Sequence, residues 1–295
     1  MNNKLSCDEN KKSNKAGARG AEGKDSSRPG PVVVPVVPPE DTGPDGFPEI
    51  HPNLPQIAGP GGGALLLMIS PVRTGKSTII SNLLLGDSDM GFYDAQERFA
   101  TTTIISNTIA NDVTSRFLAK AFDTHDSYND NIIDGIVHQQ KSYDKEEQPE
   151  IAVILDDCLG SIRREARINH LASRFRHFNI KLLVISSQNF RSCSPIIRQN
   201  ATNVIVGSPF PNQKELGKMA EEYGDVFGGG DNWLKIYKKA TPEKYSFLHM
   251  DFQSNPPKAY RSFEELIAVG ENIVGEVPDL SDEEDLELDD PKKKV

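Results

Sequence analysis

The sequence predicts an α/β fold in which a mainly parallel sheet is flanked by helices. Three observations carry this prediction: short apolar runs alternate with helical stretches from residue 64 onward, the runs are apolar throughout, and turn residues separate them. Fully apolar runs are typical of strands buried on both faces, which occur in parallel sheets. The 295 residues, 37% hydrophobic and 26% charged, suffice for one sizeable domain of ordinary globular composition.

The expected elements follow in order along the chain. Strands are predicted at residues 64–70, 101–106, 151–157, 179–188 and 201–208. Helices are predicted at residues 77–85, near 111–122, at 128–142, near 162–176 and near 212–225. Residues 232–263 are expected to form a closing antiparallel element. This alternation predicts parallel strands joined by right-handed crossovers.

Composition divides the chain into three parts: residues 1–62 as a disordered Pro/Gly-rich arm, residues 63–270 as the folded domain, and residues 271–295 as an acidic tail. The segment PVVVPVVPP within the arm favours polyproline II, as a linker or as a peptide for docking. The terminal PKKKV is either a short nuclear-import signal or an inert basic end.

Charge is distributed unevenly. The net charge is −10, but residues 276–295 hold nine acids against three lysines, whereas residues 158–214 hold nine Lys or Arg and the single acid Glu165. A phosphate backbone responds to local charge because salt screens interactions beyond about 10 Å. The basic stretch therefore predicts a nucleic-acid contact, with a solvated surface helix as the alternative.

Other classes of protein are disfavoured. No apolar run approaches the roughly 20 residues that span a bilayer, so no membrane association is expected. The three cysteines, Cys7, Cys158 and Cys193, lack the spacing of a disulfide framework or a zinc site. We expect an intracellular protein.

The string SPVRTGKST, residues 70–78, lies between an apolar strand and a helix. It matches the end of the pattern G-x-x-x-x-G-K-[ST], except that Ser70 replaces the first glycine. Such a turn directs backbone N–H groups and the helix N-terminus at phosphates, with Lys76 reaching the outer phosphates and Ser77 holding Mg²⁺. The residues expected to bind ATP are Ser70, Pro71, Val72, Arg73, Thr74, Gly75, Lys76, Ser77 and Thr78.

Acidic residues end a second apolar strand, IAVILDD. Asp156 is expected to bind Mg²⁺ together with Ser77, and Asp157 to orient or deprotonate the attacking water. Gln188 ends the next strand, at the sheet edge where ligands bind in open α/β folds. Solvated acids and a hydrogen-bonded strand-end glutamine are the structural alternatives. With the phosphate-binding turn, the pattern predicts a P-loop NTPase.

Together, SPVRTGKST, ILDD, SRFRHFNIKLLVISSQNFR and SPIIRQNAT resemble the FtsK–HerA-type genome-packaging ATPases of poxviruses, other large DNA viruses, virophages and Polinton-type elements. The resemblance covers about residues 63–263. The positions that match its later motifs are Arg176, His177, Gln188, Arg198 and Asn200.

The resemblance implies ATP-driven translocation of double-stranded DNA without sequence preference, for packaging a viral genome into a capsid. It also implies a homo-oligomeric ring with ATP at subunit interfaces, where a neighbour's arginine, Arg198 ahead of Arg176, assists catalysis, and a capsid or portal protein as a further partner. The setting would be the nucleus or a cytoplasmic virus factory. The alternative functions are a nucleotide-switched assembly factor with slow ATP turnover and a small-molecule kinase.

Overall fold

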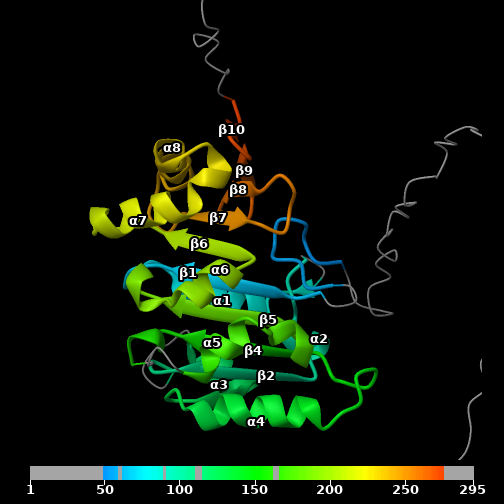
Figure 1. Ribbon diagram of the computed structural model, residues 1–295. Coiled ribbons are helices and arrows are strands. Elements are labelled where there is room, and N and C mark those ends of the chain that lie inside the picture. The colour runs from blue at the N-terminus through cyan, green and yellow to red at the C-terminus, as the bar shows by residue number, and fades with distance from the viewer. Residues whose placement is uncertain (1–48, 59–61, 89–90, 110–114, 162–165, 276–295) are drawn as a thin grey trace, which may run out of the picture. The chain divides into compact units, whose positions relative to one another are not determined.

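The structure is a computed structural model that describes residues 49–58, 62–88, 91–109, 115–161 and 166–275. Within these residues, ten strands form one sheet in the order β10-β9-β8-β7-β6-β1-β5-β4-β2-β3 (Figure 1). The strands are β1 Ala64–Ile69, β2 Thr101–Ser106, β3 Asp123–His125, β4 Ile151–Asp156, β5 Ile180–Ser187, β6 Asn203–Gly207, β7 Phe247–Asp251, β8 Lys258–Arg261, β9 Glu265–Val269 and β10 Asn272–Ile273.

Six neighbouring strands, from β6 to β3, pair in parallel, and β7 to β10 add an antiparallel half. This arrangement confirms the predicted α/β fold with a mainly parallel sheet. The helices are α1 Lys76–Leu85, α2 Ala95–Arg98, α3 Ser115–Ala121, α4 Asp130–Lys141, α5 Arg167–Ala172, α6 Pro195–Asn200, α7 Gln213–Tyr223 and α8 Gly230–Ala240. Short 3₁₀ segments are η2 Leu159–Ser161, η3 Phe175–Phe178, η4 Phe190–Ser192 and η5 Asp225–Phe227.

Helices cover both faces of the sheet because its strands are apolar on both sides. Alternate residues of β1 belong to different core clusters: Leu65, Leu67 and Ile69 face one cluster, and Leu66 and Met68 face the other. The first cluster includes side chains of α5, α6, α7 and α8, and the second those of α1, α2 and α3. In Figure 1, α5 and α6 lie in front of the sheet.

The register of three central strands places their carboxyl ends at one edge of the sheet. Ile69 of β1 pairs with Ser187 of β5, and Leu155 of β4 pairs with Ile185 of β5. Because β5 lies between β1 and β4, the segments after these three strands emerge side by side. We call this the carboxyl edge, and the opposite one, where the parallel strands begin, the amino edge.

One part of the predicted antiparallel element is wrong. Residues 232–239, NWLKIYKK, belong to α8, whereas the following segments form β7 and β8 as expected. The helix arises because Trp233, Ile236, Tyr237 and Ala240 recur at helical spacing and are all buried. Helical periodicity therefore overrides the content of bulky residues that suggested a strand.

The predicted basic helix near residues 162–176 is also corrected. Only α5 is α-helical in the described part; η3 follows it, and residues 162–165 lie outside the described residues. The helix stops at Ser173, whose hydroxyl donates to the carbonyl of His170 at 3.0 Å and so replaces a regular helical contact. Of the helix predicted near 111–122, the residues up to 114 are likewise outside the described ones.

The packed part of the domain begins earlier than residue 63. Ile50, Leu54 and Ile57 are buried in the cluster beside α1, and Gln56 exchanges hydrogen bonds with Gln253 at 3.0 and 2.8 Å. Apolar residues between the prolines thus anchor this segment. At the other end, β10 extends the domain past residue 270. PVVVPVVPP, the acidic residues after 275 and PKKKV lie outside the described residues.

No helix in the described ranges is both long and apolar enough to cross a membrane.

Candidate nucleotide-binding site

The turn after β1 presents a helix N-terminus to a cavity. Gly75 precedes α1 with a φ of 95°, a left-handed conformation that glycine adopts without steric cost. The first turn of α1 carries no acidic side chain, so its free N–H groups and positive dipole end are available to an anion. This is the geometry that the sequence predicts for phosphate binding.

Ser70, which replaces the first glycine of the pattern, is accommodated by its neighbours. Its hydroxyl is hydrogen-bonded with that of Thr74, which also donates to the carbonyl of Pro71 at 2.6 Å. A Cβ atom added to Gly207 of β6 would lie 1.8 Å from Oγ of Ser70. The serine fits because the adjacent strand has a glycine at this point.

Lys76 points back over the turn. Its Nζ donates to the carbonyls of Ser70 at 2.8 Å and Pro71 at 3.1 Å, and only 9% of the residue is exposed. Burial lowers the pKa of Lys76, and the charges of Asp157 and Asp156 oppose this shift. The ammonium group thus lies within electrostatic reach of both predicted acids.

Asp156 ends β4 and is held by two hydroxyl groups from the neighbouring strands. Ser186 of β5 donates to Oδ1 at 2.5 Å, and Ser106 of β2 donates to Oδ2 at 3.2 Å. Asp156 is 5% exposed, and burial raises its pKa above the usual range of a carboxyl group. A nearby cation would favour the charged form of such a group.

Asp157 and Gln188 meet at the ends of β4 and β5. The amide Nε2 of Gln188 donates to Oδ2 of Asp157, and the backbone N–H of Asp157 donates to Oγ of Ser186 at 3.0 Å. Asp157 has a φ of 57°, a left-handed conformation that Asp and Asn tolerate better than most residues. The glutamine therefore orients the carboxylate toward the cavity.

These groups share one cavity of 790 Å³, lined by residues 72–79 together with Thr108, Asp156, Asp157, Gln188 and Tyr245. The volume falls in the range of small-ligand sites, roughly 300–1,000 Å³. All the predicted nucleotide-binding residues after position 71 line it. Ser70 and Pro71 do not line the cavity; their backbone carbonyl groups accept hydrogen bonds from Nζ of Lys76.

Three lining residues were not predicted from the sequence: Ile79, which directly follows the predicted turn, Thr108 and Tyr245. Thr108 follows the end of β2, and the rule that ligand-binding residues follow parallel strands would have found it. Tyr245 comes from the connection between α8 and β7, far along the chain, and is half exposed beside Gly75. No local pattern in the sequence indicates its position.

The cavity fits a magnesium–nucleotide complex. Mg²⁺ prefers oxygen ligands and usually combines one or two carboxylates with phosphate oxygens and water. Ser77 and Asp156 both line the cavity and supply such oxygens. Among the described residues no group of three or more His, Cys, Asp or Glu side chains is placed to hold a metal alone. The protein groups alone make an incomplete metal site, which nucleotide phosphates would complete.

The predicted catalytic arginines lie outside this cavity. Arg198 forms an ion pair with Glu222 at 3.1 Å, and its guanidinium lies 4.4 Å from the ring centre of Phe190. Arg176 is exposed; its Nε donates to the carbonyl of Gly63 at 3.2 Å. Neither side chain lines the nucleotide cavity of its own chain.

Arg176 lies instead in a cavity of 540 Å³ at the amino edge, where η3 precedes β5 and α6 leads into β6. Arg174, His177 and Asn200 line the same cavity. This cavity brings together three of the residues that carry the sequence resemblance, Arg176, His177 and Asn200. They lie at the amino edge, whereas the P-loop lies at the carboxyl edge.

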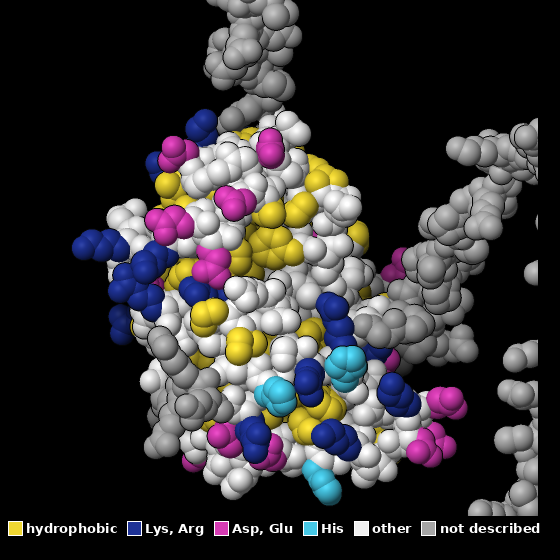
Figure 2. Space-filling model, in the orientation of Figure 1, with side chains coloured by type: hydrophobic (Ala, Val, Ile, Leu, Met, Phe, Trp, Pro, Cys, Tyr) yellow, Lys and Arg dark blue, Asp and Glu magenta, His cyan; other side chains and the backbone are white. Residues whose placement is uncertain are grey.

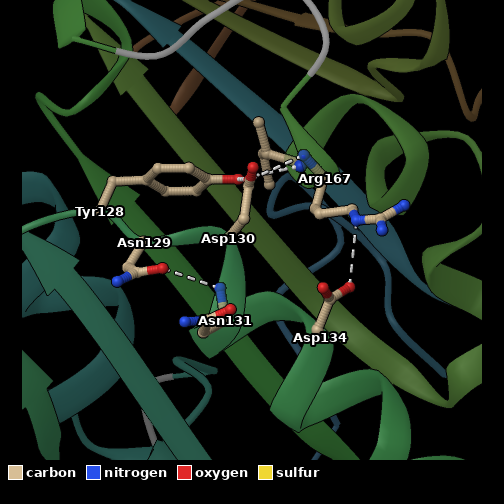
Figure 3. A network of polar contacts seen from close by, with 7 residues as sticks. Tyr128, Asn129, Asp130, Asn131, Asp134 and Arg167 are labelled. Atoms are coloured by element: carbon tan, nitrogen blue, oxygen red, sulfur yellow. Dashed lines mark hydrogen bonds and ion pairs between the residues drawn. The ribbon is translucent and has the colours of Figure 1, made fainter.

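Arg167, which belongs to the basic stretch, connects α5 to α4 through polar contacts (Figure 3). Nε of Arg167 pairs with Asp134 of α4 at 3.3 Å, and the backbone N–H of Arg167 donates to Asp130 at 2.9 Å. Tyr128 donates to the same Asp130 carboxylate at 2.6 Å. This network fixes the start of α5 against the start of α4. Arg163 and Arg164 lie outside the described residues.

No family model matches the chain, and no curated protein matches it. Solved structures do. The DNA-packaging ATPase B204 of Sulfolobus turreted icosahedral virus matches with 18% identity and a TM-score of 0.49, over 68% of this chain and 97% of that one. The genome-packaging NTPase B204 of Sulfolobus turreted icosahedral virus 2, in complex with ATP-γS, matches with 16% identity and a TM-score of 0.47, over 68% and 98%.

The cytoplasmic domain of the type VII secretion ATPase EccC from Thermomonospora curvata matches with 15% identity and a TM-score of 0.40, over 52% of this chain and 20% of that one. The parallel sheet, the turn between β1 and α1 and the acids that end β4 give the chain a P-loop NTPase-like α/β fold.

Proposed function

We propose that this chain is a magnesium-dependent ATPase that moves double-stranded DNA, and that its task is to package a viral genome into a capsid. The observation that carries the proposal is the meeting of Lys76, Asp157 and Gln188 in one cavity. They follow β1, β4 and β5, three adjacent parallel strands. A phosphate-binding turn opposite a carboxylate suits phosphoryl transfer to water.

Each residue has a role in that reaction. Lys76 and the N–H groups at the start of α1 would bind the phosphates, and Ser77 and Asp156 would hold Mg²⁺, which would neutralise phosphate charge. Asp157, oriented by Gln188, accepts a proton from the water that attacks the γ-phosphorus. The bond from that phosphorus to the ADP oxygen breaks, and ADP leaves with the electron pair.

A ring of identical subunits follows from the same proposal. Neither candidate arginine lines the nucleotide cavity of its own chain, so each could act only on a nucleotide bound to a second copy of the chain. Arg198 is engaged by Glu222, with 17% of its side chain exposed, whereas Arg176 is exposed at the amino edge. We therefore favour Arg176 as the residue that reaches a neighbour's ATP. A capsid or portal protein would complete the assembly inside an infected cell.

The proposed substrate is DNA because cations are concentrated between residues 158 and 214 despite the net charge of −10. Such a concentration binds phosphate backbones without reading sequence. The acid–glutamine pair favours water as the acceptor over the hydroxyl group of a kinase substrate.

The test is the rate of phosphate release with and without duplex DNA, on protein whose oligomeric mass is measured by light scattering. A motor should turn over several-fold faster with duplex. The Lys76→Ala variant, purified in parallel, reports any contaminating ATPase. ATP hydrolysis that ignores DNA would reject the motor and favour the nucleotide-switched assembly factor.

A further inference from the structure

A third cavity lies next to the ends of the catalytic strands β4 and β5. It has a volume of 600 Å³, and we call it the basic groove; its walls include Leu159, Asn169, Arg191, Ser194, Arg198 and Lys218. Three of its lining residues are cations and none is acidic. Figure 2 shows Lys and Arg side chains gathered at the left margin of the molecule, beside and below α7, the helix that carries Lys218.

Two of the three cations are free to bind a ligand. Arg191 and Lys218 are exposed, and neither forms an ion pair with any residue that the structure describes. Arg198 is neutralised by Glu222. Exposed, unpaired cations on a common wall keep their full attraction for an anion, because no internal carboxylate competes for them.

Residues that line the basic groove closely follow the catalytic residues in the sequence. Leu159 follows Asp157 by two positions, and Arg191 follows Gln188 by three. The segment between Gln188 and Arg191 is held firmly: Ser187 Oγ donates to the carbonyl of Asn189 at 2.9 Å, and the N–H of Phe190 donates to the buried carboxylate of Glu215 at 3.1 Å. Gln188 and Arg191 thus belong to one short segment with fixed hydrogen bonds.

The cavity at the amino edge is also lined by cations, but it lacks this connection. Arg174 and Arg176 come before β5 rather than after it, at the far end of the strand from Gln188. Two cavities lined by cations thus differ in their position along β5 relative to Gln188. Only the basic groove adjoins groups that contact the reacting phosphate in the proposed function.

We infer that the basic groove binds backbone phosphates of duplex DNA through Arg191 and Lys218, and that this contact is coupled to the nucleotide through Gln188. The inference rests on the proposed function and adds to it the DNA-contacting residues. Contacts of this kind recognise phosphates and not bases, so binding is independent of sequence and weakens with salt.

The test uses the full-length double variant Arg191→Ala/Lys218→Ala and a duplex without any chosen sequence. Its matched control is Lys235→Ala/Lys238→Ala, which removes the same charge from two exposed positions on α8. Dissociation constants are measured across a salt series, and ATPase rates with and without duplex. We expect the groove variant to bind about 10-fold more weakly, with a salt slope reduced by about two, and the control to match the wild type.

The stimulation of ATPase by duplex, expressed as the ratio of the two rates, should fall in the groove variant alone. Lys218→Glu, a single charge reversal at an exposed position, should weaken binding without changing the melting temperature. Equal losses in the groove variant and the α8 control would overturn the inference, as would a groove variant that keeps the full DNA affinity of a DNA-stimulated wild type. A wild type that DNA does not stimulate would instead reject the proposed function itself.

Discussion

The carboxyl and amino edges of the parallel strands carry different groups of polar side chains. The carboxyl edge has the phosphate-binding turn, two aspartates and a glutamine around a cavity of 790 Å³, and the one arginine among its described lining residues, Arg73, belongs to the turn itself. The amino edge has Arg174, Arg176 and His177 around a cavity of 540 Å³ that no described carboxylate lines. One edge has the turn proposed to bind a triphosphate; the other has cations without such a turn.

The comparison shows that the motif residues of the sequence resemblance do not form a single site within one chain: they line separate cavities. Loops after parallel strands converge at the carboxyl edge because all strands point the same way. Residues before the strands gather at the amino edge for the same reason. If both sets act on ATP, two copies of the chain must bring opposite edges together.

The largest effect is expected at the carboxyl edge. Lys76→Ala should abolish ATP hydrolysis and weaken ATP binding, because it removes the cation that faces both aspartates. Phosphate release and nucleotide titration measure the two effects. Lys214→Ala, an exposed lysine that lines none of the three cavities described above, serves as the control. Substantial turnover by Lys76→Ala would remove the turn from the mechanism.

Arg176→Ala tests whether the two edges act together. We expect a fall of about 10³-fold in the ATPase rate of the assembled protein, the lower end of what a neighbour's arginine contributes. Arg174→Ala, two residues away in the same cavity, should leave the rate within a few-fold.

Mixing the inactive variants sharpens this test. A subunit carrying Lys76→Ala still offers Arg176 to a neighbour carrying Arg176→Ala, whose phosphate-binding turn is intact. Co-assembled rings should therefore regain a measurable part of the activity. Mixed rings without any recovery, in the presence of demonstrated subunit exchange, would contradict a role for Arg176 in trans.

Asp157→Asn should lower turnover about 10²-fold or more while ATP still binds, because the amide cannot accept the proton. Asparagine tolerates the φ of 57° at this position, so the backbone is preserved. Single-turnover hydrolysis and nucleotide titration separate chemistry from binding. A normal rate would show that another group activates the water.

The smallest effect concerns the fit of Ser70 against Gly207. Gly207→Ala places a methyl group against the serine hydroxyl and should cost about 1–3 kcal/mol of unfolding free energy, with a several-fold loss of ATP affinity. Adding Ser70→Gly should restore most of both losses, because the atom nearest to the added Cβ would then be the Cα of residue 70, at 3.4 Å. Urea unfolding of the two variants decides the point; a double variant no better than Gly207→Ala would reject this packing account.

The positions of the parallel strands along the chain, and the polar residues at their carboxyl ends, could be predicted from the sequence. Continuous apolar runs such as 64–69 and 151–155 end in polar residues, and the parallel arrangement brings those ends together. For this reason Lys76, Asp156, Asp157 and Gln188 could be named before their positions were known.

Other features depend on contacts that local patterns do not encode. Tyr245 reaches the cavity from the antiparallel half, and Gly207 accommodates Ser70 from a strand more than a hundred residues away. Trp233 and Tyr237 suggested a strand by composition, although their spacing is helical. The ion pair between Arg198 and Glu222 likewise depends on how α6 packs near α7.

The most direct measurement is the affinity for a non-hydrolysable ATP analogue, titrated with Mg²⁺ and then with EDTA, in the wild type and in Asp156→Asn. We predict binding that weakens at least 10-fold when Mg²⁺ is removed, and a much smaller dependence on Mg²⁺ in the variant, because Asp156 is the carboxylate placed to hold the ion. Equal affinity with and without Mg²⁺ in the wild type, or no affinity at all, would contradict a magnesium–triphosphate site at the ends of β1 and β4.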